Sequence, residues 1–196
     1  MITFDYPDGA TPLDPDETGG LRLMHITTRG ELDRWEQDNI LEAIGWLSRT
    51  KPADILSESF IKKLHRRMFG HVWKWAGQFR QSDKNIGVPW HQVPTSIHNL
   101  CEDALLWIEL QDETPDLLAV RFHHRLVSIH PFPNGNGRHG RMMTDLLLEN
   151  VLSRPAFTWG GQDLSRAGTI RHAYIEALHA ADRNDISLLL SFARSQ

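Results

Sequence analysis

The segment HPFPNGNGRHGR, residues 130–141, separates the apolar runs LLAVRFHHRLVSI and MMTDLLLENVL, which are both expected to be helical. Pro131 and Pro133 cannot continue the first helix, because proline biases the residue before it away from helical geometry. Gly135 and Gly137 let the backbone turn until successive N–H groups point into one concavity. The segment therefore predicts an anion-binding loop between two helices.

The second helix is expected to begin at Asn136 or Gly137. Its first-turn N–H groups have no intrahelical partners, and its dipole is positive at that end. Arg138 and Arg141 are three residues apart in this turn, so they share a face of the helix. Their forked guanidinium groups suit phosphate oxygens. Together these features predict a site for a polyphosphate.

His130 stands at the rim of this predicted site. A histidine near its ordinary pKa, beside a bound phosphate, is suited to take a proton from an attacking hydroxyl. The implied reaction is transfer of a phosphate-containing group to an alcohol. A plain interhelical turn with solvent-facing arginines would explain any one of these residues, but the whole combination favours the site.

The composition limits the class of protein. With 196 residues, 40% of them apolar, the chain suits one domain with a sizeable core, or one domain with an extra arm. A net charge of −4 disfavours nucleic-acid binding as the main activity. Cys101 is the single cysteine, which fits a reducing compartment. With neither a signal peptide nor a membrane span in the sequence, we expect a cytoplasmic protein.

The helical periodicity predicts an all-α fold with one small β-hairpin. The hairpin is expected at residues 85–89, within a loop over residues 72–94 that is rich in aromatic residues, glycine and proline. Residues 1–20 are expected to be coil, and residues 154–164 irregular. The expected helices cover about residues 29–48, 55–69, 95–110, 115–129, 136–152, 167–181 and 186–193.

The first long helix carries a start signal and an apolar stripe. Thr28 and Glu31 fit a capping box, in which each side chain satisfies a free N–H group of the other residue. The stripe consists of Leu32, Trp35, Ile40, Ala43, Ile44 and Leu47. Glu36 and Asn39 fall in the middle of the stripe. In the next helix, the expected buried residues are Phe60, Ile61, Leu64 and Met68.

Residues 130–141 resemble the signature of Fic-domain proteins, H-x-F-x-[acid]-G-N-[G/K]-R-x-x-R, at nearly every specified position. WAGQFR and KNIGV resemble the segment before and within the family's flap hairpin, and RHAYIEALHAADRNDISLLLSF resembles its C-terminal helices. TTRGELDRWEQDNI resembles more narrowly a bacterial branch called mobile mystery protein B. The resemblance implies a Fic domain over residues 50–196, preceded by an N-terminal coil and inhibitory helix over residues 1–49.

The resemblance also implies an activity, namely transfer of AMP from ATP to a Ser, Thr or Tyr hydroxyl of a target protein, with Mg²⁺. His130 would be the general base, Phe132 would anchor the loop, and Arg141 would bind the γ-phosphate. Tyr174 would contact the adenine. The remaining phosphate contacts would come from Gly135, Asn136, Gly137 and Arg138.

The family resemblance further implies partners. The target protein would add a strand to the flap at Asn85, Ile86, Gly87 and Val88. The branch resemblance implies a small helix-turn-helix protein encoded nearby. Neither nucleic acid nor a membrane is expected as a partner, and the oligomeric state, monomer or homodimer, stays open.

Asn134 departs from the family signature, which has an acid that holds Mg²⁺ at this position. An amide oxygen can still bind Mg²⁺, but without the negative charge. The related Doc toxins also have Asn here and resemble a kinase, but they carry a lysine in place of Gly137. Because Gly137 and Arg141 are both present, AMP transfer is favoured. A Doc-like kinase, or a nucleotide-binding interaction module with weak catalysis, remains an alternative.

Many Fic proteins are held inactive by a helix with the pattern [S/T]-x-x-x-E-[G/N], whose glutamate pairs with the second arginine of the signature. Glu31 follows Thr27 at this spacing, but it also fits the cap. Glu36 is centred on the apolar stripe, where an unpaired charge would be costly. Arg141 is its natural partner, although a purely structural pairing with another arginine stays open. We prefer Glu36 over Glu31 as the inhibitory residue.

Overall fold

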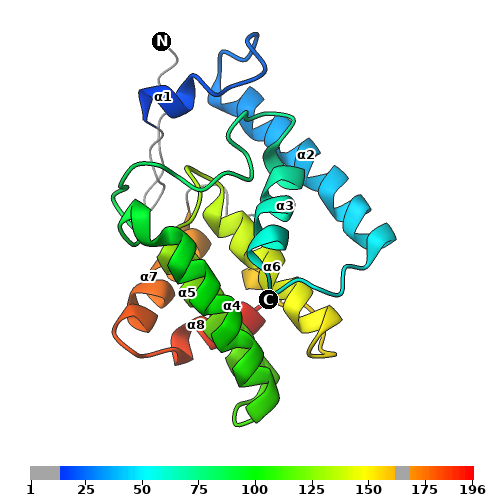
Figure 1. Ribbon diagram of the computed structural model, residues 1–196. Helices are drawn as coiled ribbons and strands as arrows, with labels where there is room; N and C mark the ends of the chain where they lie inside the picture. The colour runs from blue at the N-terminus through cyan, green and yellow to red at the C-terminus, as the bar shows by residue number, and fades with distance from the viewer. Residues whose placement is uncertain (1–13, 162–167) are drawn as a thin grey trace.

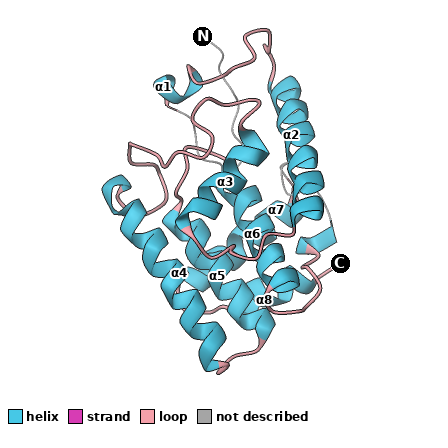
Figure 2. Ribbon diagram, turned by 45° about the vertical axis from the view of Figure 1, so that its right-hand side comes forward, coloured by secondary structure: helices cyan, strands magenta, loops and turns pink. Residues whose placement is uncertain are grey.

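The structure, a computed structural model, describes residues 14–161 and 168–196, and over these residues it contains helices and no strands (Figures 1 and 2). No helix in these ranges is long and apolar enough to cross a bilayer. The elements are α1 (Pro15–Thr18), α2 (Arg29–Thr50), α3 (Glu58–Phe69), η1 (Trp90–Gln92), α4 (Val93–Leu110), α5 (Pro115–Ile129), α6 (Asn136–Asn150), η2 (Trp159–Gly161), α7 (Thr169–Asp182) and α8 (Ser187–Arg194).

Helices α5 and α6 pack against each other at the centre of the molecule. Helix α4 lies along α5, α3 contacts both α4 and α6, and α2 lies on the outer side of α3 (Figure 1). Helices α7 and α8 form a second pair, which packs on α5 through α8. The apolar side chains form a large cluster among α2 to α6 and a smaller one where α7 and α8 meet α5.

The prediction of an all-helical chain is confirmed. The seven predicted helices correspond to α2 through α8, with ends that differ by a few residues. Helix α1 is an addition, because a short helix forms where coil was predicted. Residues 1–13 of that predicted coil, residue 167 of a predicted helix and residues 162–164 of the predicted irregular segment lie outside the described ranges.

Helix α2 begins with the predicted capping box between Thr28 and Glu31. Most of its predicted stripe is buried, as are Glu36 and Asn39 at its centre. Trp35 and Ile44, however, are 43% and 41% exposed. At 100° per residue these two side chains sit roughly 90° from the centre of the buried face. They are therefore at the edges of the surface that packs on α3, and the predicted stripe was too wide.

The predicted β-hairpin at residues 85–89 is wrong, because no strand forms anywhere in the described residues and residues 85–88 make a bend. The buried side chain of Arg80 replaces strand pairing here. Its guanidinium donates to the carbonyls of His130 (2.7 Å), Ser82 (2.9 Å) and Val88. The Arg80 backbone N–H donates to the carbonyl of Pro131 at 2.9 Å. The segment therefore lies against the α5–α6 loop instead of pairing with itself.

Replacing Arg80 tests whether this side chain holds the loop in place. We expect Arg80→Met to lower the free energy of unfolding by at least about 3 kcal/mol, since each buried carbonyl left without a donor costs about 1 to 3 kcal/mol. Arg34 is exposed on α2, so Arg34→Met should stay within about 0.5 kcal/mol of wild type. Urea unfolding followed by circular dichroism gives both values. Equal midpoints for the two variants would contradict the assignment.

Candidate active site

Phe132 and Asn136 fix the shape of the loop between α5 and α6. Phe132 is fully buried, as predicted for the anchor of the loop, and its ring stacks on His65 with 3.7 Å between centroids. The Asn136 amide accepts from the Phe132 N–H at 2.9 Å and donates to the Phe132 carbonyl at 2.8 Å. The Asn136 side chain therefore shapes the loop and is not turned toward a phosphate.

His65 is a residue of this site that the sequence analysis did not identify. It is fully buried on α3, where it accepts from the Gly77 N–H through Nδ1 at 3.0 Å. Its Nε2 must then carry the proton that is donated to the Asn134 carbonyl, also at 3.0 Å. Burial lowers the pKa of His65 well below its usual value, so the ring is neutral. The only sequence signal was its place beside Leu64 on the buried face of α3.

The glycines keep the start of α6 open to an anion. Gly135 has φ of 79°, and a Cβ there would come within 2.7 Å of the Phe69 ring. As the residue before the helix it provides no side-chain cap for the first-turn N–H groups. At Gly137 a Cβ would meet nothing nearer than Nη1 of Arg141, at 3.7 Å. The backbone of this turn can therefore be approached closely, as the predicted phosphate site requires.

His130 is neutral, as a general base requires, although its pKa is lower than the ordinary value that was expected from the sequence. It ends α5 in the left-handed conformation, with φ of 54°, and is 7% exposed. Its Nδ1 donates to the Val127 carbonyl at 3.3 Å, so Nε2 is the basic nitrogen of the neutral ring. Burial lowers the pKa of His130 to about 4, and the positive charges of Arg80 and Lys84 lower it as well. His130 is therefore neutral at pH 7.

The predicted flap residues lie beside His130, although they form no hairpin. A Cβ at Gly87 would come within 2.8 Å of the His130 Cβ. The Val88 N–H donates to the Ile129 carbonyl at 3.4 Å, and Ile86 is 44% exposed. The bend at residues 85–88 thus lies next to His130, the candidate general base.

Arg138 and Arg141 turn to opposite neighbours. The Arg138 guanidinium lies 4.8 Å from the Phe69 ring centroid and donates to Glu36 on α2 at 2.7 Å. The Arg141 guanidinium lies 5.6 Å from the ring centroid of Tyr174 on α7. The two guanidinium groups therefore do not share a face of α6 as predicted, because one faces α2 and α3 and the other faces α7.

Glu36 is buried, with 3% exposed, and paired with an arginine. One carboxylate oxygen accepts from Nε1 of Trp73 at 2.6 Å, and the other accepts from Nη1 of Arg138 at 2.7 Å. The prediction that Arg141 is the partner of Glu36 is wrong, because Arg138 is the arginine on the side of α6 that faces α2. Glu31 lies exposed at the start of α2, where it accepts from the N–H groups of Thr27 and Thr28 at 3.0 Å.

Tyr174 acts on the site through Arg141. It is 6% exposed, and its hydroxyl pairs with Nε2 of His123 at 2.8 Å, while Nδ1 of His123 pairs with the Thr144 hydroxyl at 3.2 Å. Burial raises the pKa of Tyr174. The Tyr174 hydroxyl thus bonds to His123, and its ring lies beside the Arg141 guanidinium. The adenine contact of Tyr174 stays a prediction.

Two further charged residues lie near Arg141 and were not identified from the sequence. Asp145, one helical turn later on α6, accepts from Trp159 Nε1 at 3.0 Å and the Phe157 N–H at 3.2 Å. Burial raises the pKa of Asp145 to about 6. Arg171 is half-buried on α7, and burial together with the charge of Arg141 lowers its pKa. Asp145 could have been identified from the sequence, because it follows Arg141 by four residues and therefore lies on the same face of the helix.

Asn134 does not form a magnesium site by itself. Its side-chain oxygen accepts from the Gly135 N–H at 2.6 Å. Among the described residues, no group of three or more His, Cys, Asp or Glu side chains is placed to hold a metal ion. Mg²⁺ prefers carboxylate and phosphate oxygens, so the protein residues here do not fit a resident ion.

Comparison with known proteins relates this site to one family. A family model described as Fic/DOC family matches residues 55–148. The protein adenylyltransferase Fic of Aedes aegypti is 29% identical over 143 residues, which is 71% of this chain and 27% of the relative. The protein of the same name from Drosophila melanogaster is 34% identical over 136 residues, 67% of this chain and 26% of the relative. The chain thus spans about a quarter of these relatives.

Solved structures share the fold. BepC from Bartonella tribocorum, a VirB-translocated effector protein with bound AMPPNP, has a TM-score of 0.68 at 17% identity and covers 92% of this chain and 97% of its own. The E274G form of Fic-1 from C. elegans has a TM-score of 0.64 at 22% identity and covers 81% of this chain and 48% of its own.

The buried histidines predict how stability depends on pH. Burial holds the pKa of His123 and His139 at about 3 and that of His130 at about 4, and it also lowers the pKa of His65. In the unfolded chain these groups titrate near 6.5, so the unfolded state binds more protons between pH 6.5 and 4. Asp145 has a raised pKa and therefore binds a proton more readily in the folded state, which offsets the effect of one histidine. The free energy of unfolding should therefore decrease as the pH is lowered from 6.5 to 4. The decrease is about 1.4 kcal/mol per pH unit for each additional proton that the unfolded state binds.

Urea unfolding at pH 7.0, 6.0 and 5.0 measures this dependence. His123→Gln should reduce the pH slope by about one proton, whereas His91→Gln, at an exposed position, should leave it unchanged. An unfolding midpoint that stays constant from pH 7.0 to 5.0 in the wild type would refute the assignment of neutral, buried histidines.

Proposed function

Because residues 55–148 match a family model described as Fic/DOC family, we propose that this protein is an adenylyltransferase that moves AMP from ATP to a Ser, Thr or Tyr hydroxyl of a target protein. One observation carries the proposal: His130 is a neutral base at the edge of an open helix start that Arg138 and Arg141 flank. A module that only bound nucleotides would need the helix start and the arginines, but not the base.

The geometry suits one set of bond changes. The N–H groups at the start of α6 and Arg141 hold the terminal phosphates of ATP. His130 Nε2 takes the proton of the target hydroxyl, whose oxygen forms a bond to the α-phosphorus. The bond from the α-phosphorus to the bridging oxygen of the β-phosphate breaks, and pyrophosphate leaves. Any magnesium ion would be held mainly by the phosphates and would neutralise part of their charge.

Helix α2 is the proposed inhibitory element, within the N-terminal region of residues 1–49. Its Glu36 binds Arg138, which would otherwise hold the phosphates together with Arg141. A phosphate near this guanidinium would also face the carboxylate at close range, and like charges repel strongly where water is scarce. Nucleotide binding in the productive position therefore requires the contact between Glu36 and Arg138 to open.

Docking of the target protein is proposed at Asn85, Ile86, Gly87 and Val88. The bend they form lies next to His130, and Ile86 is exposed for contact. A target segment that pairs with this backbone would bring its hydroxyl to the base. A small helix-turn-helix partner remains a proposal that rests on the branch resemblance, and a cytoplasmic location remains one that rests on the composition of the sequence. The oligomeric state, monomer or homodimer, stays open.

Radiolabelled ATP tests the activity and the inhibition together. Wild type, Glu36→Gly, His130→Ala and Asp38→Gly proteins would be incubated with ATP labelled at the α- or the γ-phosphate, alone and with cell lysate. We expect the α-label on protein to rise at least about tenfold in Glu36→Gly and to vanish in His130→Ala. A tenfold rise corresponds to removal of an unfavourable coupling of about 1.4 kcal/mol between the Glu36 contact and ATP binding. Asp38 is exposed on α2, so Asp38→Gly controls for a glycine in this helix.

Three outcomes would contradict the proposal. Transfer of γ-label alone would make the protein a kinase, as the amide at Asn134 allows. Equal α-label in Glu36→Gly and Asp38→Gly would exclude Glu36 as the inhibitor. Absence of either label on protein, with ATP still bound, would leave a nucleotide-binding module without transferase activity.

A further inference from the structure

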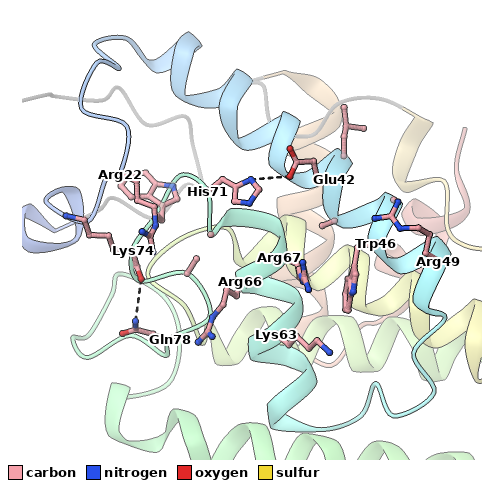
Figure 3. Close-up of a pocket in the computed structure, with 16 residues that line it drawn as sticks. Arg22, Glu42, Trp46, Arg49, Lys63, Arg66, Arg67, His71, Lys74 and Gln78 are labelled. Carbon is pink, nitrogen blue, oxygen red and sulfur yellow. Dashed lines mark hydrogen bonds and ion pairs between the residues drawn. The ribbon is translucent and has the colours of Figure 1, made fainter.

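A groove of about 1200 Å³ lies between α2, α3 and the loop that follows α3, away from His130 (Figure 3). Trp46 of α2 and Trp73 of the loop are among the residues that line it. Trp73 is the same side chain that donates to Glu36, so the groove lies directly behind the contact between Glu36 and Arg138. No step of the proposed reaction uses this groove.

Six positive side chains line the groove and are exposed. Among the described residues, none of them lies within ion-pair distance of a carboxylate, and Glu42, the one acidic residue of the lining, pairs with His71 at 3.1 Å. Figure 3 shows Lys63, Arg66 and Arg67 projecting from α3 and Arg49 from α2. The six side chains are Arg22, Arg49, Lys63, Arg66, Arg67 and Lys74.

This concentration of unpaired charge is unlike the rest of the described surface. Elsewhere arginines and lysines commonly meet a carboxylate, as Arg121, Arg125 and Arg194 do. In the groove Lys63 and Arg67 are four residues apart on one helix face, a spacing at which like charges are destabilising by a few tenths of a kcal/mol, about 0.2 to 0.5. The field of these groups is positive although the chain carries a net charge of −4.

We propose that the basic groove between α2 and α3 binds an acidic segment of a partner protein. A cationic groove complements such a segment, and the exposed Leu41 offers contact for its apolar side chains. A peptide can place an uncharged residue opposite Glu42.

Nucleic acid fits the same groove less well. Its phosphates recur along the whole strand, so one of them would face Glu42. Its bases would need an open aromatic face, but the Trp46 ring already stacks on Phe60 and has Lys63 at 5.2 Å and Arg67 at 5.0 Å from its centroid. The net negative charge of the chain also opposes a long polyanion.

Fluorescence anisotropy with a labelled peptide of repeated Glu-Glu-Leu units tests the proposal without reference to catalysis. The full chain should bind this peptide, and the double variant Arg49→Gln/Lys74→Gln should bind it about tenfold or more weakly, equivalent to about 1.4 kcal/mol. Neither residue contacts the Trp46 ring in the way Lys63 and Arg67 do. The melting temperature of each variant would be measured alongside.

The matched control is Arg34→Gln/Arg183→Gln, which removes two exposed positive charges outside the groove. This control should bind within about twofold of wild type, a difference of about 0.4 kcal/mol. The same peptide with glutamine in place of glutamate should not bind. No binding of the acidic peptide, an equal loss in both double variants, or tighter binding of an oligothymidine of equal length would overturn the proposal.

Discussion

The contact on which the rest of the structure depends is that of the buried Glu36 carboxylate with Trp73 and Arg138. An unpaired charge in this position would be strongly unfavourable, so each oxygen has a donor. One side chain thus joins α2, the loop after α3 and the first turn of α6. Helix α2 and the proposed phosphate site are therefore physically coupled, and neither can rearrange without affecting the other.

A second constraint is that the site combines a neutral base with fixed positive charge. His130 stays neutral because it is buried beneath the segment that Arg80 holds against the α5–α6 loop, and Arg80 itself adds a positive charge nearby. The loop shape comes from Phe132 and Asn136, and no side chain caps the first-turn N–H groups of α6, which are the groups that would bind an anion. Burial, which is costly for charges, here sets the protonation state that proton transfer needs.

Periodicity and local signals predicted the features that depend on neighbours in the sequence. The helices, the capping box at Thr28 and the burial of Glu36 follow from spacing and hydrogen-bonding rules that act within one helix. The pairing of Glu36 with Arg138 and not with Arg141 does not follow from such rules. Both arginines lie near the start of α6, and only the packing of α2 distinguishes them. A face of a helix can be predicted from sequence, but the partner that it meets cannot.

The missing hairpin has the same origin. Residues 85–88 have a turn-like composition, but the Val88 carbonyl accepts from Arg80, which precedes it in the sequence, and not from a neighbouring strand. His65 also escaped prediction, since its role depends on Gly77 and Asn134 in two separate loops. Residues that act by bridging segments far apart in the chain leave no local pattern.

The coupling between Glu36 and the phosphate site can be measured directly by titrating ATP into the wild-type, Glu36→Gly and Asp38→Gly proteins in a calorimeter. If Glu36 competes with phosphate for Arg138, Glu36→Gly should bind ATP about tenfold or more tightly than wild type, a gain of about 1.4 kcal/mol, while Asp38→Gly should match wild type. Equal ATP affinity in wild type and Glu36→Gly would show that the buried contact is structural and does not control the site.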